Sequence, residues 1–383
     1  MTEDTGSRPS LVLAGAGHAH VIALRDFVTR APDACVTIVT RDVLTPYSGM
    51  LPGVIAGHYP PGAAMIDVRP LAQSIGARLI QDEIVSLDAE SRSFTCASGA
   101  KLAYDVLSID IGSRPNTGDV PGAREGAIPV KPIDRLLGTF ASVEQRFAER
   151  GYAARVAVVG GGAGGVELAF AINHRLRAIA VSAGAAEARI QVLVVAGSHG
   201  LLPGFSDGFR RRVRAALESR AVRLHEGRRV ERVEDGRLFL DGGGLLEADE
   251  TLWTTQAEAA TWLASSGLAT DEAGFVAVDE TLRSTSHGNV FAAGDVASFS
   301  PMKLPKSGVY AVRQGPVLAN NLRAALSNKE LQTFKPQKHV LYILSTGDKN
   351  AIMTKYGMSL EGAPIWLLKH MIDNRFIKQF STR

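Results

Sequence analysis

The stretch RVAVVGGGAGG, residues 155–165, decides the fold of this chain. Its apolar, β-branched half leads directly into a glycine-rich turn, and a helix-like stretch follows. A turn of this kind needs glycine, its backbone must approach phosphates closely, and the first helical turn offers free N–H groups to an anion. The stretch therefore predicts a dinucleotide pyrophosphate site formed by Gly160, Gly162, Ala163, Gly164 and Gly165.

A second, shorter fingerprint lies near the N-terminus, where the apolar residues 11–13 lead into Gly15-Ala16-Gly17. Two such loops on one chain suggest two dinucleotides held face to face, as when a flavin exchanges electrons with a nicotinamide. His20 stands where the third glycine of the fingerprint usually lies, so we expect it to push helix and strand slightly apart. His18 is either a first-turn packing residue or a group that lies beside the pyrophosphate and senses its charge.

Composition and length indicate a folded protein of two or three domains, with 383 residues, 45% hydrophobic and 21% charged. The two cysteines, Cys35 and Cys96, are far apart and form no Cys-x-x-Cys pair. This disfavours disulfide or sulfide chemistry and suits a reducing, cytoplasmic compartment. The first ten residues are polar, and we expect neither a signal peptide nor a transmembrane helix. We expect no nucleic-acid partner and no metal site.

Strand-like and helix-like runs alternate along the chain, which is typical of α/β folds with parallel sheets. We expect two Rossmann-like, three-layer dinucleotide-binding domains, the second inserted in the first, and a small C-terminal α+β region. The expected limits are residues 9–120 with 267–325 for the first domain, 121–266 for the second, and 329–383 for the C-terminal region. An Ala-rich insert at residues 178–188 is expected between the second glycine loop and the next strand, residues 190–195.

Four motifs together are far more specific than either glycine loop alone. They are Gly15-x-Gly17, the strand end IDIGSRP at 109–115, the loop at 160–165, and Thr281 with Ala293-Gly294-Asp295. With them the chain, over about residues 9–380, resembles the pyridine nucleotide-disulfide oxidoreductase superfamily. Segments 17–20, 45–53 and 305–315 are most similar to type II NADH:quinone oxidoreductases and to the flavoprotein module fused to selenophosphate synthetase (selenide, water dikinase).

The resemblance implies FAD in the first domain and NAD(P)H in the second. It implies that Asp295 hydrogen-bonds the ribityl chain of FAD. The expected FAD-binding residues are Gly15, Gly17, His18, Ala19, Thr40, Arg41, Pro46, Gly112, Ser113, Arg114, Gly294, Asp295 and Lys306. The acidic residue usual on the adenosine ribose is missing at the end of the second strand, so Thr40 and Arg41 are the candidates for that end.

Two residues are expected to take part in the chemistry. In similar enzymes a glutamate placed like Glu167 approaches the nicotinamide carboxamide; the alternative is a solvated first-turn glutamate. Lys306, at an expected helix start, is a candidate for stabilising negative charge at the flavin N1/O2 edge, or is a plain surface lysine. After the strand at 190–195 the sequence has no carboxylate that could bind a ribose 2′-hydroxyl, so it does not distinguish NADH from NADPH. Arg189, Arg210 and Arg211 are candidates for binding a 2′-phosphate.

The C-terminal region is basic, because residues 329–383 hold nine Lys and Arg against four Asp and Glu. After Pro364 an apolar stripe recurs at helical spacing, with basic residues between its members: Ile365, Leu368, Ile372, Phe376 and Phe380, with Lys369, Arg375 and Lys378. This pattern fits an interfacial helix at lipid headgroups or a helix that docks on a second subunit, as in a homodimer. The alternative is packing within its own chain.

The sequence thus predicts an FAD-dependent NAD(P)H dehydrogenase that passes electrons to a quinone, peripheral to the inner face of the cell membrane. Two other functions stay open. One is a nucleotide-binding flavoprotein scaffold or partner in selenium metabolism with little turnover. The other is a reductase of a ferredoxin-like carrier.

Overall fold

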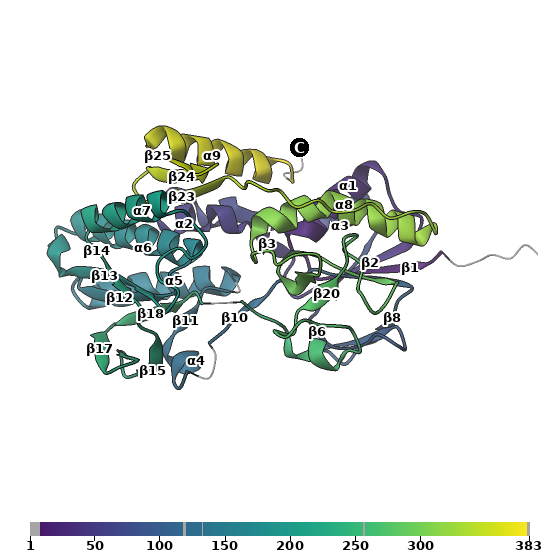
Figure 1. The fold of residues 1–383 in the computed structure, drawn as a ribbon, viewed down its shortest axis with the longest axis horizontal. Helices are drawn as coiled ribbons and strands as arrows, with labels where there is room; N and C mark the ends of the chain where they lie inside the picture. The colour runs from purple at the N-terminus through teal and green to yellow at the C-terminus, as the bar shows by residue number, and fades with distance from the viewer. Residues whose placement is uncertain (1–7, 118–119, 132, 256, 381–383) are drawn as a thin grey trace, which may run out of the picture.

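Two parallel sheets lie side by side in the computed structural model, and a C-terminal piece covers both (Figure 1). The structure describes residues 8–117, 120–131, 133–255 and 257–380. The predicted α/β class, with two dinucleotide-binding folds, is confirmed. No helix in these described residues is long and apolar enough to cross a membrane.

The first sheet has the strand order β21-β9-β1-β2-β5, and all of its pairs are parallel. Its inner strands β1 and β9 and the strand β21 are almost entirely buried, as expected of a parallel sheet between layers, whereas the edge strand β5 is partly exposed. Their bounds are β1 Ser10–Ala14, β2 Cys35–Thr40, β5 Arg78–Gln81, β9 Val106–Ile109 and β21 Val290–Ala292. Helix α1 (His18–Thr29) packs against α8 (Gly308–Leu326) on one face, beside α3 (Arg69–Ser74).

Smaller elements complete this first unit. An antiparallel sheet of β6 (Ile84–Asp88), β7 (Ser93–Cys96) and β8 (Lys101–Ala103) lies below the parallel sheet (Figure 1). Others are β3 (Leu44–Pro46), η1 (Ser48–Met50), α2 (Leu51–Ile55), η2 (Pro61–Ala64), β4 (Met65–Asp67), β20 (Val276–Val278), η5 (Gly294–Val296) and β22 (Ala297–Phe299). Helix α2 leaves this unit and packs against α6 of the second.

The second sheet, β11-β18-β12-β13-β14, is also entirely parallel. Its strands are β11 Ile128–Pro129, β12 Ala154–Val159, β13 Ile190–Ala196, β14 Val222–Glu226 and β18 Glu250–Trp253. Helices α5 (Ile133–Glu149), α6 (Ala163–Ser182) and α7 (Asp207–Ser219) lie on one side, with η3 (Glu187–Arg189) before β13. On the other side lie α4 (Ala123–Gly126) and the antiparallel β15 (Val230–Glu234), β16 (Arg237–Leu240) and β17 (Gly244–Glu247).

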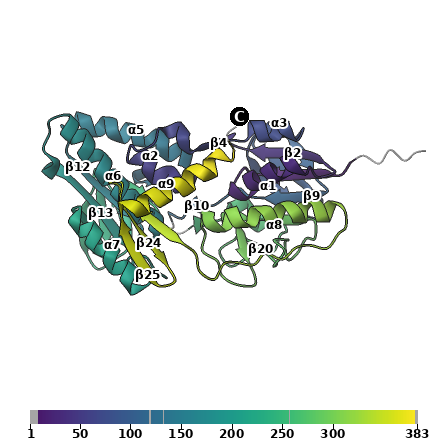
Figure 2. The ribbon, with the colours of Figure 1, turned by 90° about the horizontal axis from the view of Figure 1, so that it is seen from above.

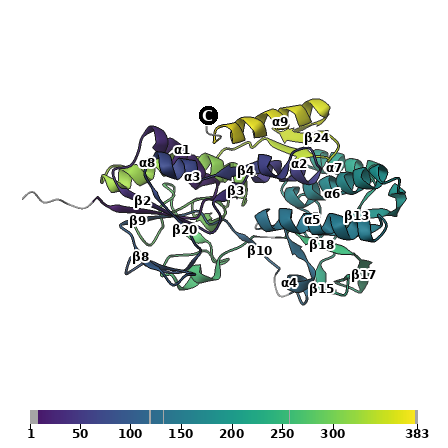
Figure 3. The ribbon, with the colours of Figure 1, turned by 180° about the vertical axis from the view of Figure 1, so that it is seen from behind.

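The two units are joined where β10 (Arg114–Pro115) pairs with β19 (Ala257–Glu258); Figure 3 shows β10 between them. The following turn η4 (Thr261–Ser265) packs against β6 of the first unit. We therefore propose to place the return to the first domain at β19, ten residues before the predicted 267. The other predicted domain limits stay as proposals.

The C-terminal piece is an antiparallel sheet, β23 (Tyr342–Ser345), β24 (Ala351–Lys355) and β25 (Met358–Gly362), followed by helix α9 (Ala363–Lys378). The sheet packs on α6 and α7. Helix α9 runs from it toward the first unit (Figure 2), where Phe376 and Phe380 join that unit's core. The predicted helix after Pro364 is present. The side of it that carries Phe376 packs within its own chain, as one of the alternatives predicted.

Two local expectations change. The Ala-rich stretch is not an insert over its whole length, because α6 continues to Ser182 and only a short turn precedes η3. Alanine's high helix propensity explains the longer helix. His20 is completely buried, and its ring lies between α1 and the strands, where it bonds Gly15 and Ser108. A glycine at this position would leave that space to closer packing of helix and strand.

Candidate active site

A large cavity, about 2360 Å³, lies between the two parallel sheets and beneath α9. Such a volume exceeds the roughly 300–1,000 Å³ of common small-molecule sites, which suits more than one long ligand. Both glycine loops open into it. Of the predicted site residues, these line it: Gly15, Gly17, His18, Thr40, Arg41, Pro46, Gly112, Ser113, Arg114, Gly162, Ala163, Gly164, Glu167, Asp295 and Lys306. Ala19, Gly160, Gly165 and Gly294 lie in the turns that shape its wall.

The first glycine loop is shaped by Asp110, which follows strand β9. A Cβ on Gly15 would lie 2.5 Å from the Asp110 carbonyl oxygen, and the Gly15 φ is +91°. A Cβ on Gly17 would collide with the Asp110 carboxylate. Glycine is therefore required at both positions.

The Asp110 carboxyl is itself unusual, since it lies wholly buried at the N-terminus of α1. Its Oδ2 accepts a hydrogen bond of 3.0 Å from the His20 backbone N–H. Burial raises the pKa of Asp110 to about 7, and the nearby Asp295 adds to the rise, while the His20 N–H opposes it. The group is thus largely neutral below pH 7, which reduces repulsion of an anion bound at this helix start.

His18 and His20 have different surroundings although they are two residues apart. The His20 ring bonds the Gly15 carbonyl oxygen at 2.6 Å and the Ser108 hydroxyl at 2.8 Å. The His18 Nε2 is buried, and among the described residues no group bonds it. Burial lowers the pKa of both imidazoles to about 4, so both are neutral near pH 7. His20 is a packing residue, whereas His18 offers an unpaired polar atom at the cavity wall.

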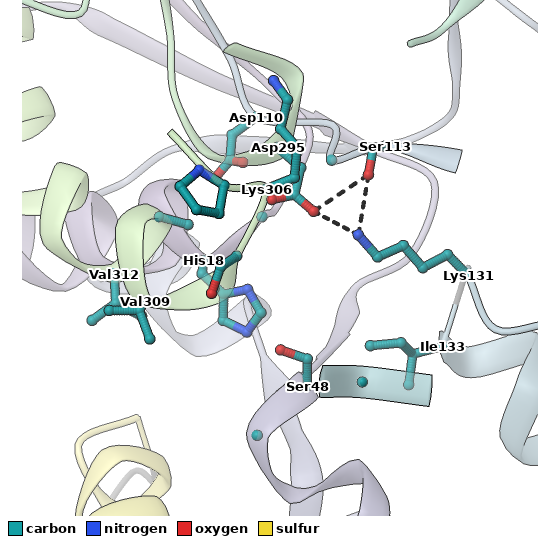
Figure 4. A pocket seen from close by; sticks show the side chains of 18 of the residues that line it. His18, Ser48, Asp110, Ser113, Lys131, Ile133, Asp295, Lys306, Val309 and Val312 are labelled. Carbon is teal, nitrogen blue, oxygen red and sulfur yellow. Dashed lines mark hydrogen bonds and ion pairs between the residues drawn. The ribbon is translucent and has the colours of Figure 1, made fainter. Parts of the chain in front are cut away.

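A triangle of polar groups joins the two units across the cavity (Figure 4). The Lys131 ammonium lies 2.5 Å from Asp295 Oδ2 and donates to the Ser113 hydroxyl at 3.1 Å. Ser113 in turn donates to Asp295 at 3.3 Å. Lys131, between β11 and α5, was not anticipated from the sequence. It holds Asp295 in the place where the ribityl chain of FAD is expected.

The far end of the cavity matches the expected adenosine end. Thr40 closes strand β2 and donates to the Asp42 carbonyl oxygen at 3.0 Å, while Arg41 pairs with the Asp42 carboxylate at 2.5 Å. Arg114 forms an ion pair of 3.0 Å with Glu83. These residues line the cavity, and their contact with a cofactor stays a prediction.

The second glycine loop has the geometry expected of a complete fingerprint. A Cβ on Gly165 would collide with the Gly160 carbonyl oxygen, so this glycine permits close packing of α6 on the strands. A Cβ on Gly162 or on Gly164 would meet nothing within 4 Å. The backbone at these two positions therefore faces open space, as phosphate approach requires.

Glu167, one turn into α6, is buried under the C-terminal helix. It accepts a 2.8 Å hydrogen bond from the Ser345 N–H and lies 3.9 Å from the Lys369 ammonium. That ammonium also donates to the Gly49 carbonyl at 2.5 Å and to Asp373 at 2.8 Å. The Tyr47 hydroxyl donates to Asp373 at 3.1 Å. Glu167 is therefore not a solvated first-turn glutamate.

Charge compensation in this group is reflected in the pKa values. Burial raises the pKa of Glu167, and the Lys369 ammonium and the Ser345 N–H oppose the rise only in part. For Lys369 burial works against the charge, but Glu167 and Asp373 outweigh it and raise its pKa. The cavity thus contains a buried acid beside a buried, charged ammonium.

Lys306 lines the cavity just before α8, and its ammonium group bonds within the protein. Its ammonium donates to the Ala297 carbonyl at 2.6 Å and lies 3.7 Å from the centre of the Phe275 ring. Burial lowers the pKa of Lys306 to about 8, opposed by Asp295. Helix α8 begins at Gly308, close to the expected start. A direct role of the lysine at a flavin stays a prediction and requires the side chain to turn away from Ala297.

Four further cavity residues carry chemistry that the sequence reasoning missed: Asp110, Lys131, Lys369 and Asp373. Asp110 was read only as part of a strand end. The sequence shows Lys369 only as one of the basic residues between members of the apolar stripe, whereas its side chain is only 13% exposed. A polar pair at i, i+4, Lys369 with Asp373, within an apolar stripe was the available signal.

The residues present fit a dinucleotide in each loop. The orphaned His18 Nε2, the glycines that the contacts with Asp110 require at positions 15 and 17, and the raised pKa of Asp110 together suit an anionic pyrophosphate at α1. The open Gly162 and Gly164 suit a second one at α6. Neither cysteine lines the cavity: Cys35 lies exposed on β2 and Cys96 buried on β7.

Comparison with known proteins finds oxidoreductases among the relatives of this chain. The chain is 31% identical over 293 residues to the alternative NAD(P)H-ubiquinone oxidoreductase C1 of Arabidopsis thaliana, which covers 69% of this chain and 54%, about half, of that protein. It is 22% identical to a type II NADH:quinone oxidoreductase of Staphylococcus epidermidis over 97% of this chain and 95% of that one.

A solved structure, NDH2 of Plasmodium falciparum in complex with NADH, matches with a TM-score of 0.82. Its sequence is 16% identical, and the match covers 97% of each chain. The likeness shows that the fold is shared over nearly the full length. Residues 9–315 match the family model described as pyridine nucleotide-disulphide oxidoreductase. The chain belongs to the pyridine nucleotide-disulphide oxidoreductase family, whose cofactors are FAD and a nicotinamide dinucleotide.

Proposed function

We propose that this protein is an FAD-dependent dehydrogenase that oxidises NAD(P)H and passes the electrons to a quinone. The observation that carries the proposal is the single cavity into which both glycine loops open, with Glu167 and Lys369 at its end under α9. The named relatives, oxidoreductases of NAD(P)H and quinone, support the same assignment.

Each glycine loop would bind one of the two dinucleotides. Gly15, Gly17 and His18 would hold the FAD pyrophosphate, with Asp295 and Lys131 at the ribityl chain. Gly162 and Gly164 would hold the nicotinamide dinucleotide. Bound FAD would accept hydride from the nicotinamide and release two electrons to the acceptor.

The residues under α9 would supply the protons that a quinone takes up with two electrons. Glu167, buried and with a raised pKa, is a proton donor, and the Lys369 ammonium can stabilise negative charge on a quinone oxygen. Tyr47 and Phe376, stacked at a centroid distance of 4.4 Å, form an apolar wall beside them. No cysteine lines the cavity, which argues against a disulfide acceptor.

We further propose that the acceptor arrives from a lipid surface. Six large apolar side chains of the C-terminal piece are each at least 43% exposed, and we propose that they form one C-terminal apolar face: Tyr356 before β25, Met358 and Leu360 on β25, and Leu367, Met371 and Ile372 on α9. Arg375 and Lys378 adjoin it in the last turn of α9. Ile372 also lines the cavity, so the cavity reaches the surface at this face. Apolar side chains flanked by cations suit an anionic lipid surface.

Anaerobic mixing tests the central proposal. We expect the yellow holoprotein to lose its flavin absorbance within seconds of adding millimolar NADH or NADPH, and to regain it when a short-chain quinone is added. A flavin that neither nucleotide bleaches would overturn the dehydrogenase assignment. Bleaching that a ferredoxin-like carrier reverses, and quinone does not, would overturn the quinone as acceptor.

Vesicle binding tests the lipid surface. The double variant L367Q/M371Q should lose co-sedimentation with vesicles of anionic phosphatidylglycerol, while Leu245→Gln, an equally exposed leucine on β17, should bind like the original protein. Equal binding by both variants would refute the proposed face. A concentration-dependent dimer that only L367Q/M371Q dissociates would assign the face to a second copy instead.

A further inference from the structure

The second dinucleotide loop lacks the acid that selects NADH. In Rossmann folds a carboxylate at the end of the second strand bonds the ribose 2′-hydroxyl and repels a 2′-phosphate. Here that strand is β13, and it ends at Ala196, which is fully buried. Gly197, Ser198 and His199 follow, so the turn itself carries no carboxylate.

The neighbouring strand does not supply the missing acid. Glu226, the last residue of β14, is paired with Ala196 in the sheet register. One of its oxygens accepts the Leu201 N–H at 2.8 Å, and Arg214 donates to both oxygens at 2.8–3.0 Å. Its charge and its acceptor atoms are therefore used inside the protein.

An arginine lies instead beside the end of β13. A Cβ on Gly197 would be 3.2 Å from Cγ of Arg229, so the arginine stem packs on the turn where the adenosine ribose is expected. The Arg229 side chain is 73% exposed, and its closest carboxylate, Asp241, is 3.8 Å away. Its guanidinium is thus only loosely paired and can turn to a phosphate.

Two of the three arginines named from the sequence, Arg189 and Arg210, are placed less well. Arg189 precedes β13, at the amino end of the strand, and donates to the Gly151 carbonyl oxygen at 3.0 Å. A nucleotide binds at the opposite, carboxyl end of a parallel sheet. Arg210 pairs with Asp207 on its own helix.

We propose that the protein prefers NADPH and that Arg229 binds its 2′-phosphate, with Ser198 and His199 as further hydrogen-bond donors in the same turn. This rests on the proposed function, since it specifies which nicotinamide dinucleotide the second loop takes. A charge-assisted pair of this kind corresponds to an affinity factor of roughly 10–150.

Single-turnover flavin reduction measures the preference. In the variant Arg229→Gln we expect the dissociation constant for NADPH to rise at least 10-fold and that for NADH to change less than 3-fold. The control Arg237→Gln removes an exposed arginine from β16 of the same unit and should leave both constants unchanged. Tighter binding of NADH by the original protein, or equal weakening of both nucleotides in Arg229→Gln, would overturn the inference.

A binding measurement separates this inference from the dehydrogenase proposal, because it needs no hydride transfer. Calorimetry of the holoprotein with adenosine 2′,5′-bisphosphate and with AMP should show tighter binding of the bisphosphate, and Arg229→Gln should abolish the difference. Equal affinity for the two probes in the original protein would refute the 2′-phosphate site even if both nucleotides reduce the flavin. A bisphosphate preference without flavin reduction would leave the site standing and overturn the dehydrogenase.

Discussion

The Lys369 ammonium lies 3.9 Å from a carboxylate oxygen of Glu167, although the two residues belong to different parts of the fold. Glu167 is on α6 beside the nucleotide loop, and Lys369 is on the C-terminal helix α9. Their side chains are only 15% and 13% exposed. This contact ties the C-terminal piece to the second dinucleotide-binding unit.

The first prediction concerns the stability that this contact contributes. Lys369→Met leaves two buried carboxylates without their ammonium partner, and breaking a buried pair costs about 3–5 kcal/mol. Glu167→Gln should cost less, because Lys369 keeps Asp373. In a double-mutant cycle by urea unfolding we expect a coupling energy of about 1 kcal/mol or more. Additive effects would show that the pair contributes nothing.

The second prediction separates two roles of Glu167. If it donates a proton to the acceptor, Glu167→Gln should slow flavin reoxidation by quinone roughly 100-fold and leave flavin reduction by nucleotide within 3-fold. Since the protonated acid is the donor, the reoxidation rate of the original protein should fall as pH rises through the raised pKa of Glu167, and the variant should lack this limb. Slower reduction with unchanged reoxidation would assign Glu167 to the nicotinamide. Stopped-flow measurement of both half-reactions decides.

The third prediction compares equivalent glycines in the two loops. Gly17 and Gly162 each precede a helix with the same extended backbone. Gly17→Ala places a methyl group on the Asp110 carboxylate, so we expect at least a 10-fold loss of FAD and a lower melting temperature.

Gly162→Ala is the matched control, because its methyl group meets no protein atom within 4 Å. That variant should retain FAD and its melting temperature, yet bind the nicotinamide dinucleotide more weakly, since the methyl group faces the phosphates. FAD content, measured by absorbance, and melting temperature check the predictions for both variants. Full FAD occupancy in Gly17→Ala would contradict the assignment of the first loop.

Local sequence signals predicted the parts of the fold that depend on backbone conformation. The glycine turns, the helices that begin at His18 and Ala163, and the apolar parallel strands follow from residue type and periodicity alone. The site was predicted as far as it lies in these turns. Contacts between distant segments were not, because no local pattern encodes them.

Asp110 and Lys131 illustrate the limit. An aspartate at a strand end is ordinarily a turn residue, and only the approach of α1 and η5 makes Asp110 buried. Lys131 lies in a connecting loop, and its partner Asp295 is 164 residues away. The tail helix was ambiguous for a physical reason as well, since both its sides are partly apolar: one packs on the core and the other stays exposed.

The last prediction concerns how ionisation of the buried Asp110 carboxyl changes the stability of the protein with pH. Its pKa is about 7 in the folded protein and about 3.9 in an unfolded chain. A carboxyl with a raised folded pKa stabilises the fold fully below the unfolded value, and this stability is lost as pH rises toward the folded one. Between pH 4 and pH 7 the loss is on the order of 4 kcal/mol.

Asp110→Asn retains the acceptor for the His20 N–H and removes the ionisation. Its melting temperature relative to the original protein should therefore rise from pH 4 to about pH 7 and level off above the folded pKa, so that the asparagine variant is relatively more stable at the alkaline end. His18 and His20 act equally in both proteins, so the difference isolates Asp110. A difference in melting temperature that does not change with pH would show that the carboxyl titrates normally and that the α1 terminus is hydrated.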